Sequence, residues 1–297
     1  TFNVDSTLYE YYQRCQEYLL EPVVLSMSDT LFRMAGERHD ERMQAVAIAT
    51  QLDYYYFQGT NEDSVIHYTN KVKEFAKATH QPKYYYFAWA NRLVTYYLKT
   101  SRTNIALYEV QNMLKEAQKE DDKTGLSRCY NIMSQIYTIK RFDSMAFEWR
   151  LKEIELTEKY NIENYNISQT YAQIANYYIS QKKQKEALRA VEKAISTANS
   201  STQQISAKLE YVNYYSKFGD FQAAEKILKE CQIAFEQDKR LESIKKRLYN
   251  IECLYYQQTR QYQKALEAAE MQEKEEHPLS ESILSSSHYR TQGEIYQ

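Results

Sequence analysis

The polar side chains best suited to binding in this sequence are amides and cations. An Asn or Gln side chain both donates and accepts hydrogen bonds, so a row of amides suits the backbone of an extended peptide. Arg and Lys beside them could hold a carboxylate. The candidate residues for a ligand-binding groove are Asn91, Arg128, Asn131, Gln135, Asn176, Asn213, Lys217, Arg247, Asn250, Gln257 and Arg290.

Residues for catalysis or metal binding form no recognisable set. The five histidines are scattered, and none lies in an HExxH motif or at a spacing typical of a Ser- or Cys-based catalytic group. The four cysteines form no CxxC pair, so we expect buried free thiols. The glycines form no phosphate-binding loop. We therefore expect no cofactor, no metal and no enzyme activity, although an enzyme whose residues converge from distant segments stays an alternative.

A regular spacing of tyrosines indicates the elements that must position the polar residues. The signature tyrosines are Tyr56, Tyr97, Tyr137, Tyr178, Tyr215, Tyr256 and Tyr296, at gaps of 41, 40, 41, 37, 41 and 40 residues. Nine residues after the first six stand Val65, Ala106, Ala146, Ala187, Ala224 and Ala265. A small residue there lets two helices approach closely while the Tyr fills the space between them. The spacing predicts repeated helix pairs.

One stretch carries a specific resemblance. The segment YAQIANYYISQKKQKEALRAVEKA, residues 171–194, resembles the tetratricopeptide (TPR) pattern position by position, except that Val191 stands where an aromatic residue is usual. The resemblance implies an all-α fold, a right-handed superhelical TPR-like α-solenoid of antiparallel helix pairs. Its first helices would line a concave groove that contains the candidate residues. The period exceeds the about 34 residues usual for TPR, so a HEAT-like helical repeat is the main alternative.

The spacing divides the chain into parts of one continuous array over 1–297, since a solenoid grows by adding repeats. The parts are a degenerate helix pair (1–40), repeats at 41–79, 83–119, 126–160, 167–198, 204–238 and 240–276, and a truncated repeat (283–297). Gly36, Gly59, Gly125 and Gly219 are expected between helices. Asp53 occupies the small-residue position of its repeat, where a carboxylate must be paired, solvated or moved off the packed face; we favour a local register change that moves it off that face.

The amino-acid composition limits the kinds of partner that we expect for this chain. The net charge is −2, from 38 basic and 40 acidic residues, so no basic surface indicates nucleic-acid binding. No apolar run of about 18 residues is present, so we expect no direct membrane insertion. The 30 tyrosines are expected mainly between packed helices.

A second resemblance concerns the parent protein. The segments DSTLYEYYQRCQEYL, PVVLSMSDTLFRMA and YYYFAWANRLV resemble the extracytoplasmic TPR sensor portion of membrane-anchored bacterial histidine kinases and related transcriptional regulators. The resemblance implies a periplasmic sensor domain within a longer chain that carries a signal peptide, a transmembrane helix and a kinase or DNA-binding part. The expected partner is a peptide, glycan or protein in the concave groove, with homodimerisation possible. The alternative is a cytoplasmic TPR scaffold or peptide-pheromone receptor with no membrane link.

Overall fold

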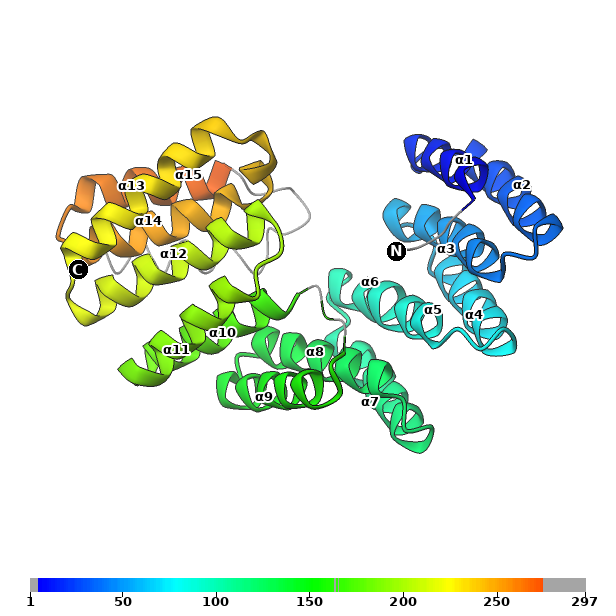
Figure 1. The fold of residues 1–297 in the computed structure, drawn as a ribbon, viewed down its shortest axis with the longest axis horizontal. Coiled ribbons are helices and arrows are strands. Elements are labelled where there is room, and N and C mark those ends of the chain that lie inside the picture. Colours follow the sequence, from blue (N-terminus) through cyan, green and yellow to red (C-terminus); the bar gives the residue numbers. More distant parts are fainter. Residues whose placement is uncertain (1–4, 163, 165, 275–297) are drawn as a thin grey trace. The chain divides into compact units, whose positions relative to one another are not determined.

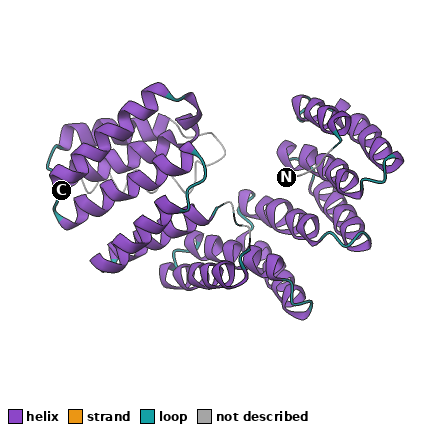
Figure 2. Cartoon of the chain, viewed as in Figure 1, coloured by secondary structure: helices purple, strands orange, loops and turns teal. Residues whose placement is uncertain are grey.

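The computed structural model describes residues 5–162, 164 and 166–274 of the chain. These residues form helices joined by short turns, and they contain no β-strand (Figure 2). The all-α prediction is confirmed for this part of the chain. The chain divides into two compact units, 1–162 and 163–297, where the sequence suggested one array. We call them unit 1 and unit 2.

Within each unit, every helix packs against the next one along the chain (Figure 1). Unit 1 contains α1 (Ser6–Glu17), α2 (Val23–Glu37), α3 (Glu41–Gln58), α4 (Glu62–Ala78), α5 (Pro82–Tyr86), η1 (Phe87–Val94), α6 (Thr95–Lys99), α7 (Thr103–Lys119), α8 (Lys123–Ile139) and α9 (Asp143–Tyr160). Unit 2 contains α10 (Ile167–Ser180), α11 (Gln184–Ser196), α12 (Ser201–Phe218), α13 (Phe221–Gln237), η2 (Lys239–Ile244), α14 (Lys245–Gln258) and α15 (Tyr262–Lys274).

The first helices of successive pairs also contact one another. In unit 1 these contacts join α1 to α3, α3 to α5 and α5 to α8; in unit 2 they join α10 to α12 and α12 to α14. Contacts limited to near neighbours along the chain are consistent with helical repeats. The first helices therefore form a row in each unit.

Side-chain caps explain where several of these helices begin. An Asp, Asn or Ser just before the helix accepts a hydrogen bond from a main-chain N–H in the first turn, which would otherwise lack a partner. Such caps are Asp40 to Met43 N–H, Asn61 to Ser64 N–H, Asp122 to Gly125 N–H, Ser200 to Gln203 N–H and Asp220 to Ala223 N–H.

The small-residue positions lie in the core, as their spacing predicted. Val65, Ala106, Ala146, Ala187, Ala224 and Ala265 are all 0% exposed. The tyrosines are less uniform, since Tyr56 and Tyr97 are buried while Tyr137 and Tyr178 are half-buried. The four cysteines are buried free thiols, and burial raises the pKa of Cys129 to about 12 and those of Cys231 and Cys253 to about 11.

The turns inside the helix pairs repeat as well. In five of them a residue with positive φ is followed by a residue whose N–H donates to the carbonyl of the signature tyrosine at 2.8–2.9 Å. The positive-φ residues are Ser101, Arg141, Lys182, Gly219 and Arg260. This is the Schellman arrangement that satisfies carbonyls at a helix end. The signature tyrosine thus supplies a main-chain acceptor to the turn in addition to its ring.

Gly219 and Lys182 allow a matched test of this turn. Gly219 has φ +88, and a Cβ added to it would meet no atom within 4 Å, so Gly219→Ala should cost about 1–2 kcal/mol of unfolding free energy through left-handed backbone strain alone. Lys182→Ala, at φ +57, should cost little because Lys182 already carries a Cβ. Denaturant unfolding measures both, and equal effects would contradict the explanation.

Two glycines lie where the sequence did not place them. Gly36 and Gly125 were expected between helices, but Gly36 lies inside α2 and Gly125 inside α8. A Cβ on Gly125 would meet the ring of the fully buried Tyr86, so this glycine makes room for an aromatic side chain of the neighbouring helix. Only Gly59 and Gly219, among the glycines that the structure describes, end helices in the left-handed conformation.

Candidate functional site

Unit 2 contains a buried polar cluster between successive first helices. Glu210 of α12 is 1% exposed; one of its carboxylate oxygens accepts a hydrogen bond from Arg247 of α14, and the other, Oε2, is buried without a hydrogen-bond partner. Nearby, Asn213 of α12 donates to Asn176 of α10 at 2.6 Å. Burial raises the pKa of Glu210, and Arg247 and the two amides oppose that rise. These side chains connect the three first helices of the unit.

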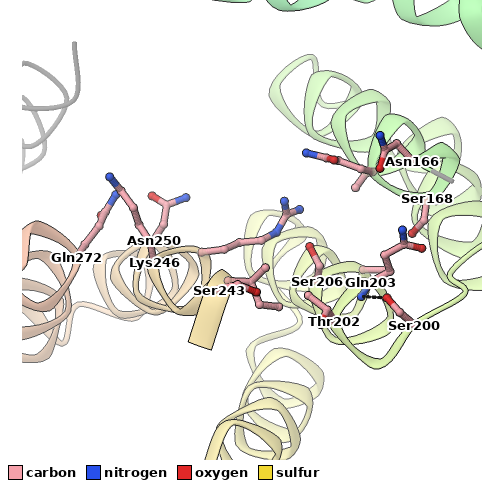
Figure 3. Close-up of a pocket in the computed structure, with 15 residues that line it drawn as sticks. Asn166, Ser168, Ser200, Thr202, Gln203, Ser206, Ser243, Lys246, Asn250 and Gln272 are labelled. Atoms are coloured by element: carbon pink, nitrogen blue, oxygen red, sulfur yellow. Dashed lines mark hydrogen bonds between the residues drawn. The ribbon is translucent and has the colours of Figure 1, made fainter. Parts of the chain in front are cut away.

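Beside this cluster lies an open groove of about 700 Å³. The first turns of α10, α12 and α14 line it, together with η2 and Gln272 of α15. We define the unit-2 groove by its lining residues Asn166, Ser168, Gln169, Ala172, Ser200, Thr202, Gln203, Ser206, Ala207, Ser243, Ile244, Lys246, Arg247, Asn250 and Gln272. Figure 3 shows hydroxyl, amide and ammonium groups from several helices of unit 2 around one open space.

The electrostatics of the unit-2 groove favour an anion. Its lining includes Lys246 and Arg247 and no carboxylate, although Arg247 also pairs with Glu210 outside the lining. The starts of α10 and α12 also contribute to it, and main-chain N–H groups at a helix start carry partial positive charge, although Ser200 already caps one of them in α12. Its lining also includes no aromatic side chain. The groove therefore offers hydrogen-bond donors and positive charge without a flat apolar platform.

Unit 1 has a smaller cavity of about 170 Å³ on its first helices. The residues that line it are Tyr12, Val46, Ala49, Thr50, Asp53, Lys83, Tyr84, Phe87 and Arg128. Arg128 donates from Nη1 to Asn91 Oδ1 at 2.5 Å, and its Nε is buried with no acceptor. Burial lowers the pKa of Arg128.

The structure shows Asp53 in an ion pair, the alternative that the sequence analysis did not favour. Its carboxylate pairs with Arg92 Nε at 2.5 Å, both side chains being 16% exposed. The Arg92 guanidinium in turn lies over the rings of Phe87 and Tyr56, at 4.5 and 4.9 Å from their centroids. An ion pair and aromatic contacts thus accommodate the carboxylate.

The segment that carries Asn91 and Arg92 is itself unusual. Residues Phe87–Val94 form a π-helical stretch, η1, between α5 and α6. Such wide turns are rare and are often found at functional sites. The stretch lies beside both the Asp53–Arg92 pair and the Arg128–Asn91 contact.

The structure places the remaining predicted residues as follows. Asn131 donates to both carboxylate oxygens of buried Glu153 at 3.2 Å and accepts from Gln135 at 2.7 Å. Lys217 is exposed at the end of α12, and Gln257 is half-buried near the end of α14. Arg247 and Asn250 line the unit-2 groove, whereas Arg128 lines the unit-1 cavity. Arg290 lies outside the described residues.

Sequence reasoning missed the two acids that organise these contacts. Glu153 and Glu210 are each 1% exposed; Glu153 accepts from the predicted Asn131, and Glu210 accepts from the predicted Arg247. A signal for Glu210 did exist, since Arg247 follows it by 37 residues, close to one repeat. Two residues of opposite charge that are separated in the sequence by about one repeat length predict a contact between neighbouring repeats.

Comparison of the sequence with protein families and with characterised proteins gives no match. Among solved structures, 41 chains resemble the fold. One is the crystal structure of BtubC (BKLC) from P. vanneervenii, with a TM-score of 0.56 and 13% identity over 77% of this chain and 91% of that one. At this identity the likeness shows a helical-repeat-like fold alone. Within the described chain, no helix is both long and apolar enough to cross a bilayer.

Proposed function

We propose that this chain is a TPR-like interaction and sensing domain that binds an extended acidic segment of a partner polypeptide in the unit-2 groove. The proposal rests on one observation above all: Lys246, Arg247 and the starts of α10 and α12 line the groove, no carboxylate lines it, and Glu210 offsets the charge of Arg247 alone. Its amides and hydroxyls suit a peptide backbone, while its positive charge suits Asp, Glu or a terminal carboxylate. The repeated Tyr and Ala positions support the TPR-like assignment over a HEAT-like one.

A glycan is the second candidate, and it fits the groove less well. Sugar rings present apolar faces that pack well on aromatic rings, and none lines the unit-2 groove. A glycan of uronic acids would still satisfy the positive charge. Competition of the bound peptide by polygalacturonate, but not by neutral dextran, would favour this candidate.

A fluorescein-labelled peptide of alternating Glu and Ser residues tests the main proposal by fluorescence anisotropy. Lys246→Ala with Asn250→Ala should weaken binding about tenfold, equivalent to about 1.4 kcal/mol. Lys226→Ala is the matched control, because it removes one positive charge from an exposed site of α13 outside the groove. Raising the ionic strength to about 150 mM, where the Debye length is about 8 Å, should weaken binding further.

Two results would contradict the proposal. One is equal affinity for a peptide of alternating Lys and Ser residues. The other is the same loss of affinity in Lys226→Ala as in the groove variant.

We further propose that the domain serves a signalling protein anchored in a bacterial membrane, with this portion on the periplasmic side. Helical repeats bend through small changes at each helix interface, so a bound peptide could alter the curvature of a unit and pass that change on. Sequencing the coding region on both sides separates the possibilities. A hydrophobic span followed by a kinase core would support the sensor, whereas a preceding helix-turn-helix segment would favour the cytoplasmic receptor.

A further inference from the structure

Two arginines occupy the same place in the two units. Arg128 lies nine residues before Tyr137 in α8, and Arg247 lies nine residues before Tyr256 in α14. Each reaches back 37 residues to a side chain of a preceding first helix. One chain therefore provides two versions of a single contact, which can be compared directly.

The two versions differ in charge balance. Arg247 reaches the carboxylate of Glu210, which neutralises it inside the protein. Arg128 reaches the neutral amide of Asn91, and no carboxylate among the described residues pairs with it. Asp53 lines the same cavity, but its carboxylate already pairs with Arg92. Arg128 is thus a largely desolvated cation without an internal counter-ion.

Such an arrangement has a cost in free energy. Removing a charge from water is unfavourable unless a charged or strongly polar partner replaces the lost hydration. Burial is the cause that lowers the pKa of Arg128, and no acidic group offsets it. Its Nε–H is buried without an acceptor, but so is that of Arg247, so the difference between the two arginines lies in the missing carboxylate. An oxyanion in the cavity would supply that missing charge.

The cavity beside Arg128 indicates what the rest of such a ligand would be. Tyr12, Tyr84 and Phe87 contribute aromatic walls, and the volume is about 170 Å³. Pockets for drug-sized ligands usually measure about 300–1,000 Å³, so this one suits a single side chain or a small acid. A planar carboxylate matches the guanidinium fork better than a spherical ion does.

We propose that the unit-1 cavity binds a carboxylate carried on a small apolar or aromatic body, with the Arg128 guanidinium as its counter-ion. The site lies within unit 1 and is independent of peptide binding in the unit-2 groove. The carboxylate belongs either to a free small acid or to the C-terminal residue of a polypeptide, and the chemistry recognised by Arg128 is the same.

Isothermal titration of the whole protein with phenylacetate and with its neutral analogue phenylacetamide tests the site. Phenylacetate should bind at least about tenfold more tightly, a difference of about 1.4 kcal/mol. Arg128→Gln should abolish this preference, whereas Arg33→Gln, at an exposed position of α2, should leave it unchanged. The tripeptide Gly-Gly-Phe, as free acid and as amide, identifies the source: tighter binding of its acid than of phenylacetate indicates a polypeptide C-terminus.

A second variant separates binding from folding. Arg128→Leu should fold with an unchanged or raised melting temperature, because it removes an uncompensated charge, and phenylacetate should no longer raise that temperature. A lowered melting temperature in Arg128→Leu together with unchanged phenylacetate binding in Arg128→Gln would overturn the proposal. Equal binding of phenylacetate and phenylacetamide would also overturn it. So would the absence of binding by both phenylacetate and the free acid of Gly-Gly-Phe at concentrations up to about 10 mM, because a millimolar site has a binding free energy of about −4 kcal/mol.

Discussion

Truncation of Glu210 to alanine should lower the free energy of unfolding of unit 2 by about 3–5 kcal/mol, the usual cost of removing one partner from a buried ion pair. Arg247 would keep its charge but lose the buried carboxylate with which it pairs. Glu236→Ala, at an exposed position of α13, is the matched control and should change stability little. Denaturant unfolding followed by circular dichroism measures both.

The isosteric variant Glu210→Gln separates charge from hydrogen bonding. It keeps an acceptor oxygen, so it should cost much less than Glu210→Ala. It also removes a titration: burial raises the folded-state pKa of Glu210 above its ordinary 4.5, so the folded protein binds this proton more tightly than the unfolded chain does. The stability that this tighter proton binding contributes is fully present below pH 4.5, and it is lost as the pH rises through the folded-state pKa of Glu210.

Wild-type protein should therefore lose stability relative to Glu210→Gln as the pH rises from 4.5, and the two curves should run parallel above the folded-state pKa. Unfolding curves collected across this range give the comparison. The difference in unfolding free energy between the wild type and Glu210→Gln could instead stay constant with pH, or grow in favour of the wild type as the pH rises. Either result would show that burial is not the dominant influence on the pKa of Glu210.

Gly125→Ala should destabilise unit 1, although alanine favours helices. A Cβ at this position would lie 2.6 and 2.7 Å from Cε2 and Cε1 of Tyr86, whose side chain is fully buried and cannot withdraw. Overpacking of this kind costs about 1–3 kcal/mol. The helix propensity gained by replacing Gly with Ala returns only about 1 kcal/mol. The net effect on unfolding free energy should be a loss.

Gly36→Ala is the control for this substitution. Gly36 also lies inside a helix of unit 1, but its Cβ would approach only the terminal amide of Gln44, at 2.9 Å, and that flexible side chain can move. Gly36→Ala should leave stability unchanged or raise it by up to about 1 kcal/mol. In a Tyr86→Leu background the cost of Gly125→Ala should fall, because the shorter side chain frees the space. A cost unaffected by Tyr86→Leu would mean that the ring is not the obstacle.

The sequence predicted the packed positions well, because packing imposes a periodic pattern. A close helix crossing needs a small residue, and that need recurs once per repeat from Val65 to Ala265. The turns inside the helix pairs were harder to predict, because only Gly219 among the five left-handed turn residues is a glycine. At the other four the Schellman hydrogen bonds, rather than residue type, hold the conformation.

The candidate site was predicted only in part, since polar contacts between repeats depend on pairs of residues rather than on single ones. Arg128 and Arg247 look alike in the sequence, and their different partners decide what each can bind. The π-helical stretch η1 was not predicted, because the segment YYYFAWANRLVTYYL is rich in aromatic residues and its spacing carries no signal that separates a π-helical turn from an α-helical one. The spacing of Asp53 pointed to the packed face, but a register change was expected because its partner Arg92 was not recognised.

Alkylation of the buried cysteines measures how often each unit opens. Cys15 and Cys129 lie in unit 1, while Cys231 and Cys253 lie in unit 2. Alkylating reagents react with thiolates, and burial both hides these sulfurs and keeps them protonated near neutral pH. A buried cysteine can therefore be alkylated only when its surroundings open locally. The order in which the four cysteines are alkylated then shows which of the two units opens more often.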